Sequence, residues 1–318
     1  MANPTPDISV IVPVYNELEN IPELLKRIHQ TFQNAELSYE LILVDDGSTD
    51  GSRESYPEFI APYPQATVVL LSRNFGQQPA ISAGINRARG KTACFIDADL
   101  QDPPEVIPDM LKELAAGYDV IYGKRTQRDG ETFFKKATSK LFYKSLSWLA
   151  STEIPRDAGD FRVMNRKALD ALKALPERRR FLRGMISWIG FKQKAFEYER
   201  HSRFAGETHY TLTKMIQFAA IGITSFSTAP LRFVTYSGLL ILSLSLIASI
   251  VVIAVKFTNP DYFLPGFTPI ILLLMFFGGF QTFCMGLVGE YVGRVYDEAK
   301  GRPLYIVSQI LQSHDPDE

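Results

Sequence analysis

The sequence predicts an α/β domain with a mostly parallel sheet, followed by two membrane-spanning helices. In the first two-thirds of the chain, strand-like apolar segments alternate with helix-like segments, a pattern typical of right-handed crossovers. The polar clusters of this part fall at the carboxyl ends of the strands, where such sheets bind ligands. After Leu231, the apolar residues gather in two long uncharged runs. An ordinary α/β domain joined to two membrane helices is therefore expected.

The strands and helices are expected in alternating order. Continuous apolar runs suit parallel strands that are covered on both faces. The first helix has Pro22 in its first turn, where proline is favoured, and its apolar residues share one face. The expected strands are residues 8–14, 39–44, 67–71, the run that begins at Ala93, and 119–123; the expected helices are 20–31, 79–89, 105–116 and one beginning near Arg166.

Composition excludes several classes of protein. The chain has 318 residues, with Lys+Arg 34 against Asp+Glu 35 and a net charge of −1, so a nucleic-acid partner is not expected. Cys94 and Cys284 lie in very different segments, which argues against a disulfide framework and fits a reducing compartment. Residues 1–7 lack the basic and apolar regions of a secretory signal.

Residues 93–104 form the central stretch, an apolar strand that stops at a group of carboxylates and two prolines. If the strand continues through them, Asp97 and Asp99 share one side, because strand side chains alternate. Two such carboxylates repel unless a cation lies between them, and hard oxygen ligands suit Mg²⁺ or Mn²⁺. A cation of this kind is normally shared with a diphosphate. The alternative is a strand that ends in a solvated acidic turn.

Three motifs resemble those of the family 2 glycosyltransferases, which have the GT-A fold, a Rossmann-like architecture. They are Pro-Val-Tyr-Asn-Glu at 13–17, Val-Asp-Asp-Gly-Ser-Thr-Asp at 44–50 and Asp-Ala-Asp at 97–99. Within that family the chain is most similar to polyprenyl-phosphate glycosyltransferases, above all the bactoprenol glucosyltransferases of the GtrB type, which are related to dolichol-phosphate mannose synthase. A dinucleotide-binding or P-loop site is not favoured, because neither glycine-rich motif is present.

The resemblance implies roles for individual residues of the donor site. Asp97, Asp99 and Gln101 would face the metal ion and the diphosphate. Asp45 belongs to the second motif, and the alternative for it is that it merely supports its own turn, since Asp-Asp-Gly-Ser is good turn chemistry. The basic pair after strand 119–123 would lie beside the diphosphate, where leaving-group charge develops, unless it is only a solvated surface pair. The nucleotide-sugar residues are Pro13, Tyr15, Glu17, Asp46, Gln78, Asp97, Ala98, Lys124 and Arg125.

The acceptor side is expected in the middle of the chain. Residues 132–150 interleave lysines with aromatic residues and predict an amphipathic helix at the membrane interface, or else a helix on a soluble core. By the resemblance, Asp157 is the catalytic base or orients the acceptor. Asp160 is the alternative carboxylate for this role, although it is rather expected to cap the following helix. Arg200 and Arg203 are the predicted contacts of the acceptor phosphate, since guanidinium groups match phosphate geometry.

The last third predicts membrane attachment. Residues 233–255 and 267–288 contain no charged side chain and exceed the roughly 20 residues that span a bilayer. Basic residues flank the two runs, which places the preceding domain and the tail in the cytoplasm. Gly279, Gly286 and Gly293 recur every seven residues, within the second run and just after it, and suggest close helix packing in a homo-oligomer. The expected parts are the domain 1–230 with a second interfacial helix at 210–228, the membrane part 231–290, and the tail 291–318.

These observations predict a membrane enzyme with its catalytic domain on the cytoplasmic side of the inner (plasma) membrane. The resemblance implies inverting transfer of glucose from UDP-glucose to undecaprenyl phosphate or another polyprenyl phosphate. A mannose synthase that uses GDP-mannose is one alternative. A catalytically silent, membrane-anchored nucleotide-binding module is the other.

Overall fold

The structure is a computed structural model that describes residues 5–125, 158–177, 180–199 and 267–313, with isolated helical positions between 234 and 258. The described residues fall into two compact units. The first combines the N-terminal domain with residues from 303 onward. The second contains helix α10 (Phe267–Ala299).

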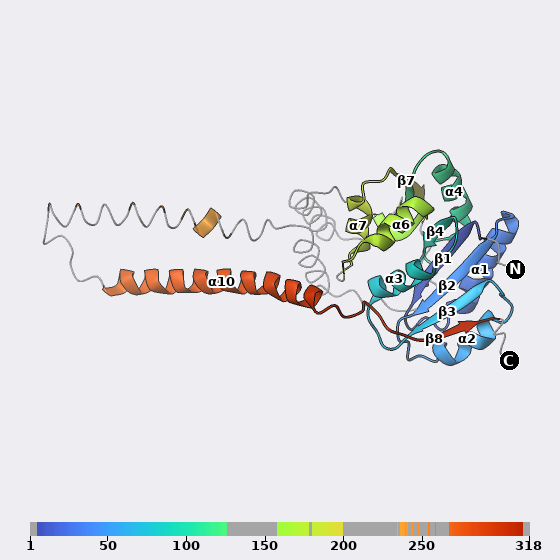
Figure 1. Ribbon diagram of the computed structural model, residues 1–318, viewed down its shortest axis with the longest axis horizontal. Helices are drawn as coiled ribbons and strands as arrows, with labels where there is room; N and C mark the ends of the chain where they lie inside the picture. The colour runs from blue at the N-terminus through green and yellow to red at the C-terminus, as the bar shows by residue number, and fades with distance from the viewer. Residues whose placement is uncertain are drawn as a thin grey trace. The chain divides into compact units, whose positions relative to one another are not determined.

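The first unit is built on one eight-stranded sheet with the order β7-β5-β6-β4-β1-β2-β3-β8 (Figure 1). Strand β1 pairs in parallel with β2 and β4, β2 with β3, and β5 with β7. Strand β6 runs antiparallel between β4 and β5, and β8 runs antiparallel to β3. The bounds are β1 (Ile8–Val14), β2 (Tyr39–Asp45), β3 (Ala66–Leu71), β4 (Thr92–Phe95), β5 (Val120–Arg125), β6 (Ala158–Asn165), β7 (Gln193–Tyr198) and β8 (Val307–Gln312).

Helices cover both faces of the sheet. Apolar side chains of α1, α2 and α4 form one core with β1, β2 and β3, in which Phe32, Tyr56 and Met110 are fully buried. Helices α3 and α6 cover the other face, where Gly84 lets α3 approach Ile11 of β1 more closely than any side chain would allow. The bounds are α1 (Ile21–Asn34), α2 (Ser52–Ile60), α3 (Gln77–Arg87), the 3₁₀ turn η1 (Pro104–Val106), α4 (Ile107–Ala115), α6 (Arg166–Ala174) and α7 (Leu182–Trp188).

The central strands and helices lie where the sequence predicts them. Strands β1, β2 and β3 are buried almost throughout, which explains why they appear in the sequence as unbroken apolar runs. The sheet is nevertheless more mixed than expected, since β6 and β8 are antiparallel. Five elements were not predicted from the sequence: β6, α2, α7, β7 and β8.

Helix α10 contains the second predicted membrane run and continues beyond it to Ala299. In the described part of the chain, no helix combines the length and the apolarity that a membrane crossing requires. The prediction of two membrane helices is therefore without structural support. Most of the first predicted run (233–255) and both predicted interfacial helices (132–150 and 210–228) lie outside the described residues.

Candidate active site

The loops after the parallel strands β1, β2, β3 and β4 leave the sheet at the same end, as the placement of the polar clusters predicts. Asp45 is the register partner of Val14, and Phe95 that of Ile11, so β1, β2 and β4 end close together. The hydrogen bonding to β1 continues one residue beyond the end of both β2 and β4. The Asp46 amide donates to the Val14 carbonyl (2.8 Å), and the Ile96 amide donates to the Ile11 carbonyl (3.1 Å). The residues that follow these strands form the candidate active site.

The loops after β1 and β2 are joined by reciprocal hydrogen bonds through Asn16. Its amide donates to Ser48 Oγ (3.0 Å), and its side-chain Oδ1 accepts from the Thr49 amide (2.8 Å). Asn16 has a positive φ of 56°, a conformation that asparagine tolerates better than most residues. Tyr15, predicted to line the nucleoside pocket, has a 48% exposed side chain on this fixed loop. A ligand can therefore reach Tyr15 without opening the loop.

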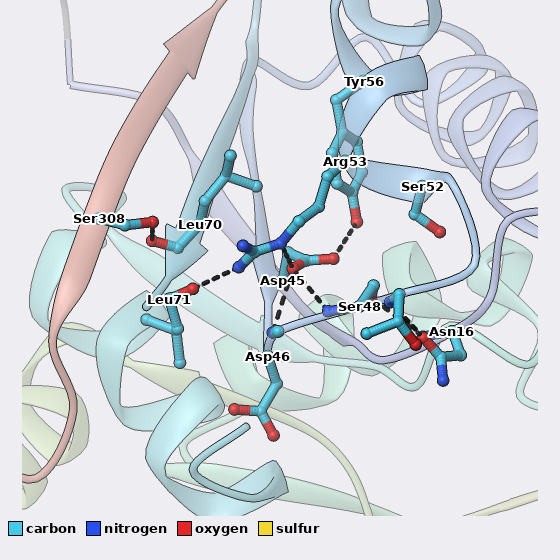
Figure 2. A network of polar contacts seen from close by, with 12 residues as sticks. Asn16, Asp45, Asp46, Ser48, Ser52, Arg53, Tyr56, Leu70, Leu71 and Ser308 are labelled. Carbon is cyan, nitrogen blue, oxygen red and sulfur yellow. Dashed lines mark hydrogen bonds and ion pairs between the residues drawn. The ribbon is translucent and has the colours of Figure 1, made fainter. Parts of the chain in front are cut away.

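Asp45 holds the loop after β2, and Figure 2 shows its carboxylate directed toward Arg53 and Tyr56. Oδ1 accepts hydrogen bonds from the Gly47 and Ser48 amides (3.1 and 3.0 Å) and from Arg53 Nε (2.8 Å). Oδ2 accepts from the Tyr56 hydroxyl (3.1 Å). The side chain is fully buried, so its charge is stabilised only by these donors. The structure therefore favours the alternative, in which Asp45 supports the turn.

We expect Asp45→Asn to lower the free energy of unfolding by about 2 kcal/mol. The amide replaces a charge that pairs with Arg53, and its NH₂ group faces other donors. Breaking a fully buried ion pair costs about 3–5 kcal/mol, and the partial exposure of Arg53 reduces that figure. Urea denaturation measures the change. The matched control is Asp109→Asn, which breaks an exposed helical pair with Lys112 and should change stability by less than about 0.5 kcal/mol. Equal losses in the two variants would contradict the role of Asp45.

Asp46 points away from this network in Figure 2 and fastens the loop that follows β3. Its two carboxylate oxygens accept from the amides of Phe75 (2.7 Å) and Gly76 (2.8 Å). Burial raises the pKa of this carboxyl above its usual value, against the lowering effect of the two amides. At Gly47, with φ +78°, any Cβ would collide with the backbone of residues 73 and 74. The loops after β2 and β3 are thus in backbone contact, and the nucleoside contact of Asp46 stays a prediction.

The chain turns between Asp97 and Asp99, so the expectation that they share one side of an extended strand is wrong. Strand β4 ends at Phe95, Ala98 and Asp99 form a turn, and Leu100 has a positive φ of 58°. Asp99 Oδ1 accepts from the Gln101 amide (3.2 Å) within this turn. The two carboxylates are brought together by the turn and not by strand alternation.

Acidic side chains nevertheless concentrate around Asp97. Burial and the nearby carboxylates of Asp160, Asp102 and Asp99 together raise the pKa of Asp97 to about 7, whereas Arg183 opposes the shift. Asp160 is near because β6 runs antiparallel to β4 with Arg162 opposite Phe95, so the residues just after Phe95 lie close to those just before Arg162. Within the described residues, no three His, Cys, Asp or Glu side chains are placed to hold a metal ion by themselves. A cation here would need ligand atoms from the substrate as well.

Asp160 does not cap helix α6, contrary to the prediction. The cap is Asn165, whose side chain accepts from the Ala168 amide (2.9 Å). Asp160 instead receives two hydrogen bonds from Arg183 of α7 (2.8 and 3.0 Å) in a largely buried ion pair. No sequence signal links these residues, because the pair depends on how α7 packs.

Two adjacent glutamines begin helix α3, and only one was predicted as a site residue. Gln78 Oε1 accepts from the Leu182 amide (2.9 Å) and so holds the start of α7. Gln77 Nε2 donates to Asp97 Oδ1 (2.8 Å). Neighbouring helical residues point about 100° apart, so the sequence alone does not show which glutamine meets the carboxylate.

Some predicted residues have other partners or lie outside the described residues. Lys124 pairs with Glu197 across β5 and β7 (2.7 Å). Arg125 is the last residue of β5, but its side chain lies outside the described part of the structure. The predicted catalytic and acceptor residues Asp157, Arg200 and Arg203 are also outside the described residues.

A separate groove between α1 and α4 has a volume of about 840 Å³ and contains none of the candidate site residues. Two ion pairs lie in its lining, Arg27 with Glu105 (2.6 Å) and Lys91 with Asp7 (2.8 Å). It therefore has no evident role in the chemistry of the candidate site.

Comparisons with known proteins agree with this geometry. Residues 9–173 match the family described as glycosyl transferase family 2, and residues 229–295 match the GtrB C-terminal hairpin. The chain belongs to glycosyl transferase family 2. This family 2 glycosyltransferase is 45% identical to the uncharacterized glycosyltransferase YkcC of Bacillus subtilis (strain 168), over 95% of this chain and 93% of that protein. It is 37% identical to the SfII prophage-derived bactoprenol glucosyl transferase of Shigella flexneri, over 95% of this chain and 97% of that one.

Solved structures with low identity to this family 2 glycosyltransferase were also found. Glucosyl-3-phosphoglycerate synthase from Mycobacterium tuberculosis is 19% identical with a TM-score of 0.47, covering 68% of this chain and 76% of that one. The matched family region runs from β1 into α6 and so includes every strand that borders Asp46 and Asp97. The resemblance seen in the motifs is confirmed, and so is the assignment as a glycosyltransferase.

Proposed function

We propose that this glycosyltransferase transfers a hexose, with glucose from UDP-glucose favoured, to undecaprenyl phosphate or another polyprenyl phosphate. The observation that carries the proposal is the extent of the match to the bactoprenol glucosyl transferases, which spans 95% of the chain and includes the GtrB C-terminal hairpin. A relative matched in its catalytic part alone would not indicate the acceptor. The products are polyprenyl-phosphate sugar and UDP.

The chemistry follows from the two substrates. A phosphate oxygen of the lipid forms a new bond to the anomeric carbon while the bond from that carbon to the diphosphate breaks, and the configuration inverts. A phosphate monoester has a second pKa of about 6, so the nucleophile is mostly ionised at neutral pH. The role that remains for Asp157 is to take the last proton or to orient the acceptor. Arg200 and Arg203 would bind the acceptor phosphate, and Lys124 and Arg125 would lie near the leaving diphosphate.

A divalent ion, Mg²⁺ or Mn²⁺, fits the donor site. Asp97 and Asp99 offer hard carboxylate oxygens, and Gln101 is adjacent. Burial and repulsion between carboxylates raise the pKa of Asp97, and the repulsion is relieved when a cation lies among them. When bound, the ion neutralises charge that develops on the leaving diphosphate. Asp97 and Asp99 would hold it, together with oxygens of the substrate.

The proposal places the enzyme at the cytoplasmic face of the plasma membrane. It is supported by the uncharged sequence runs at 233–255 and 267–288, which we propose as membrane helices, and by the basic residues that flank them. Nucleotide sugars are available on that side. A homo-oligomer is part of the same proposal.

A transfer assay in membranes tests donor and acceptor together. Membranes that contain the protein are incubated with polyprenyl phosphate and, in turn, radiolabelled UDP-glucose, other UDP-sugars and GDP-mannose. We expect chloroform-extractable label with UDP-glucose and only in the presence of Mg²⁺ or Mn²⁺. Label from GDP-mannose alone would establish a mannose synthase instead. Absence of lipid label with every donor, while nucleotide still binds, would favour the catalytically silent module.

A further inference from the structure

The start of helix α3 contacts the carboxylate at the centre of the acidic group. Gln77 is the first residue of the helix, and its Nε2 atom donates to Asp97 Oδ1 at 2.8 Å. The preceding Gly76 has φ 102°, which few other residues adopt, and its amide is fixed by Asp46. The position from which Gln77 reaches Asp97 is therefore set by the loop after β3.

The neighbouring glutamine, Gln78, connects the start of α3 with Asp160 of strand β6 through helix α7. Gln78 accepts from the Leu182 amide (2.9 Å), and the next residue, Arg183, holds Asp160 by two hydrogen bonds. Asp97 follows β4, and Asp160 lies in β6. Two successive side chains of α3 thus fix two carboxylates. Gln77 fixes Asp97, just after β4, directly, and Gln78 fixes Asp160 of β6 through α7.

We propose that Gln77 is a positioning residue that occupies Oδ1 of Asp97 and so directs Oδ2 toward the donor diphosphate and its divalent cation. This inference rests on the proposed function of the site. Within the described residues, Gln77 is the hydrogen-bond donor to the Asp97 side chain, and it contacts one of the two oxygens. The other oxygen is the one available to a ligand.

The chemistry of the amide suits this task. A carboxylate rotates freely about its terminal bond unless a hydrogen bond fixes one oxygen. An ammonium group in the place of Gln77 would also fix this oxygen, but it would neutralise the negative charge of Asp97 that binds the cation. A carboxylate there would repel Asp97. A neutral donor holds the geometry and leaves the full negative charge of Asp97 for the metal ion.

The test measures binding separately from turnover in the full-length protein in detergent. Mn²⁺ is titrated calorimetrically in the presence of UDP, with Gln77→Ala, Gln77→Lys and the control Gln33→Ala, an exposed glutamine of helix α1. Loss of an outer partner of a metal ligand typically weakens metal binding by about 10–100-fold. We expect weakening of about 10-fold in Gln77→Ala and at least as much in Gln77→Lys, with no change in Gln33→Ala. The Tm should stay the same in all three, since Gln77 is exposed.

The outcomes separate this inference from the proposed function. If the unmodified protein does not bind Mn²⁺ with UDP, both the metal-assisted function and the role of Gln77 are overturned. If it binds and Gln77→Ala binds equally well, only the positioning role is overturned. A Gln77→Lys variant that restores normal Mn²⁺ affinity would show that a donor at the helix start suffices and that charge is irrelevant, which also contradicts the inference.

Discussion

Asp99→Asn is expected to lower the rate of sugar transfer by roughly 10³-fold at every Mg²⁺ or Mn²⁺ concentration. The amide preserves the acceptor that bonds the Gln101 amide, so the turn after β4 stays intact. It removes one of the two charges proposed to hold the cation. Loss of an outer partner already reduces metal affinity or activity by about 10–100-fold, and loss of a direct ligand should exceed this. Initial rates of lipid-linked sugar formation, measured across a metal titration, give the result.

The control for this variant is Asp170→Asn on α6. That residue forms an exposed pair with Arg166 away from the acidic group, and transfer should be unchanged. Recovery of the Asp99→Asn rate at high Mn²⁺ would indicate weaker metal binding without a direct part in the reaction. A rate close to that of the unmodified protein would remove Asp99 from the metal site altogether.

Asp157→Asn is expected to retain nucleotide binding and to lose turnover by about 10²–10⁴-fold, the usual contribution of a positioned acid–base group. The pH dependence distinguishes its two possible roles. Above the phosphate pKa of about 6, fewer acceptor molecules carry a proton. If Asp157 removes that proton, the defect should shrink as the pH rises from 6 to 8. If Asp157 orients the acceptor, the defect should be the same at both ends of that range.

Two measurements complete this prediction. UDP affinity, determined with Mn²⁺ present, should be within about twofold of the unmodified protein, because Asp157 is proposed to act on the acceptor. Asp160→Asn provides a contrast, since Asp160 is held by Arg183 and its loss should lower stability as well as rate. Unchanged turnover in Asp157→Asn would refute its assignment at any pH.

The sequence predicts the central fold well because burial leaves a direct signal. Strands β1, β2 and β3 are covered on both faces, so nearly every residue in them is apolar. The turn role of Asp45 was also accessible, because the motif Asp-Asp-Gly-Ser forms a turn through local hydrogen bonds. Features that depend on neighbouring residues in the sequence, such as buried strands and the Asp45 turn, were therefore predictable.

The parts that were not predicted depend on contacts between distant segments or on one backbone angle. Asp99 leaves the strand direction because the chain turns at residues 98–99, and Leu100 then takes a positive φ that the presence of a leucine does not predict. Asp160 meets Arg183, 23 residues away, only after α7 has packed. Gln77 and Gln78 are chemically identical, and their different partners follow from the helix phase. These features decide the geometry around Asp97, so the site was less predictable than the fold.

Strand β8 has a consequence for how the chain matures during synthesis. Ser308 of β8 bonds the Leu70 carbonyl of β3, a residue 238 positions earlier. At about 5–20 residues per second, a ribosome needs roughly 10–50 s to make the intervening chain. Throughout that interval the outer edge of β3 has no partner strand and is open to pairing with other nascent chains. The domain can therefore complete its sheet only after β8 has been synthesised. Chains that stall before β8 should bind chaperones most.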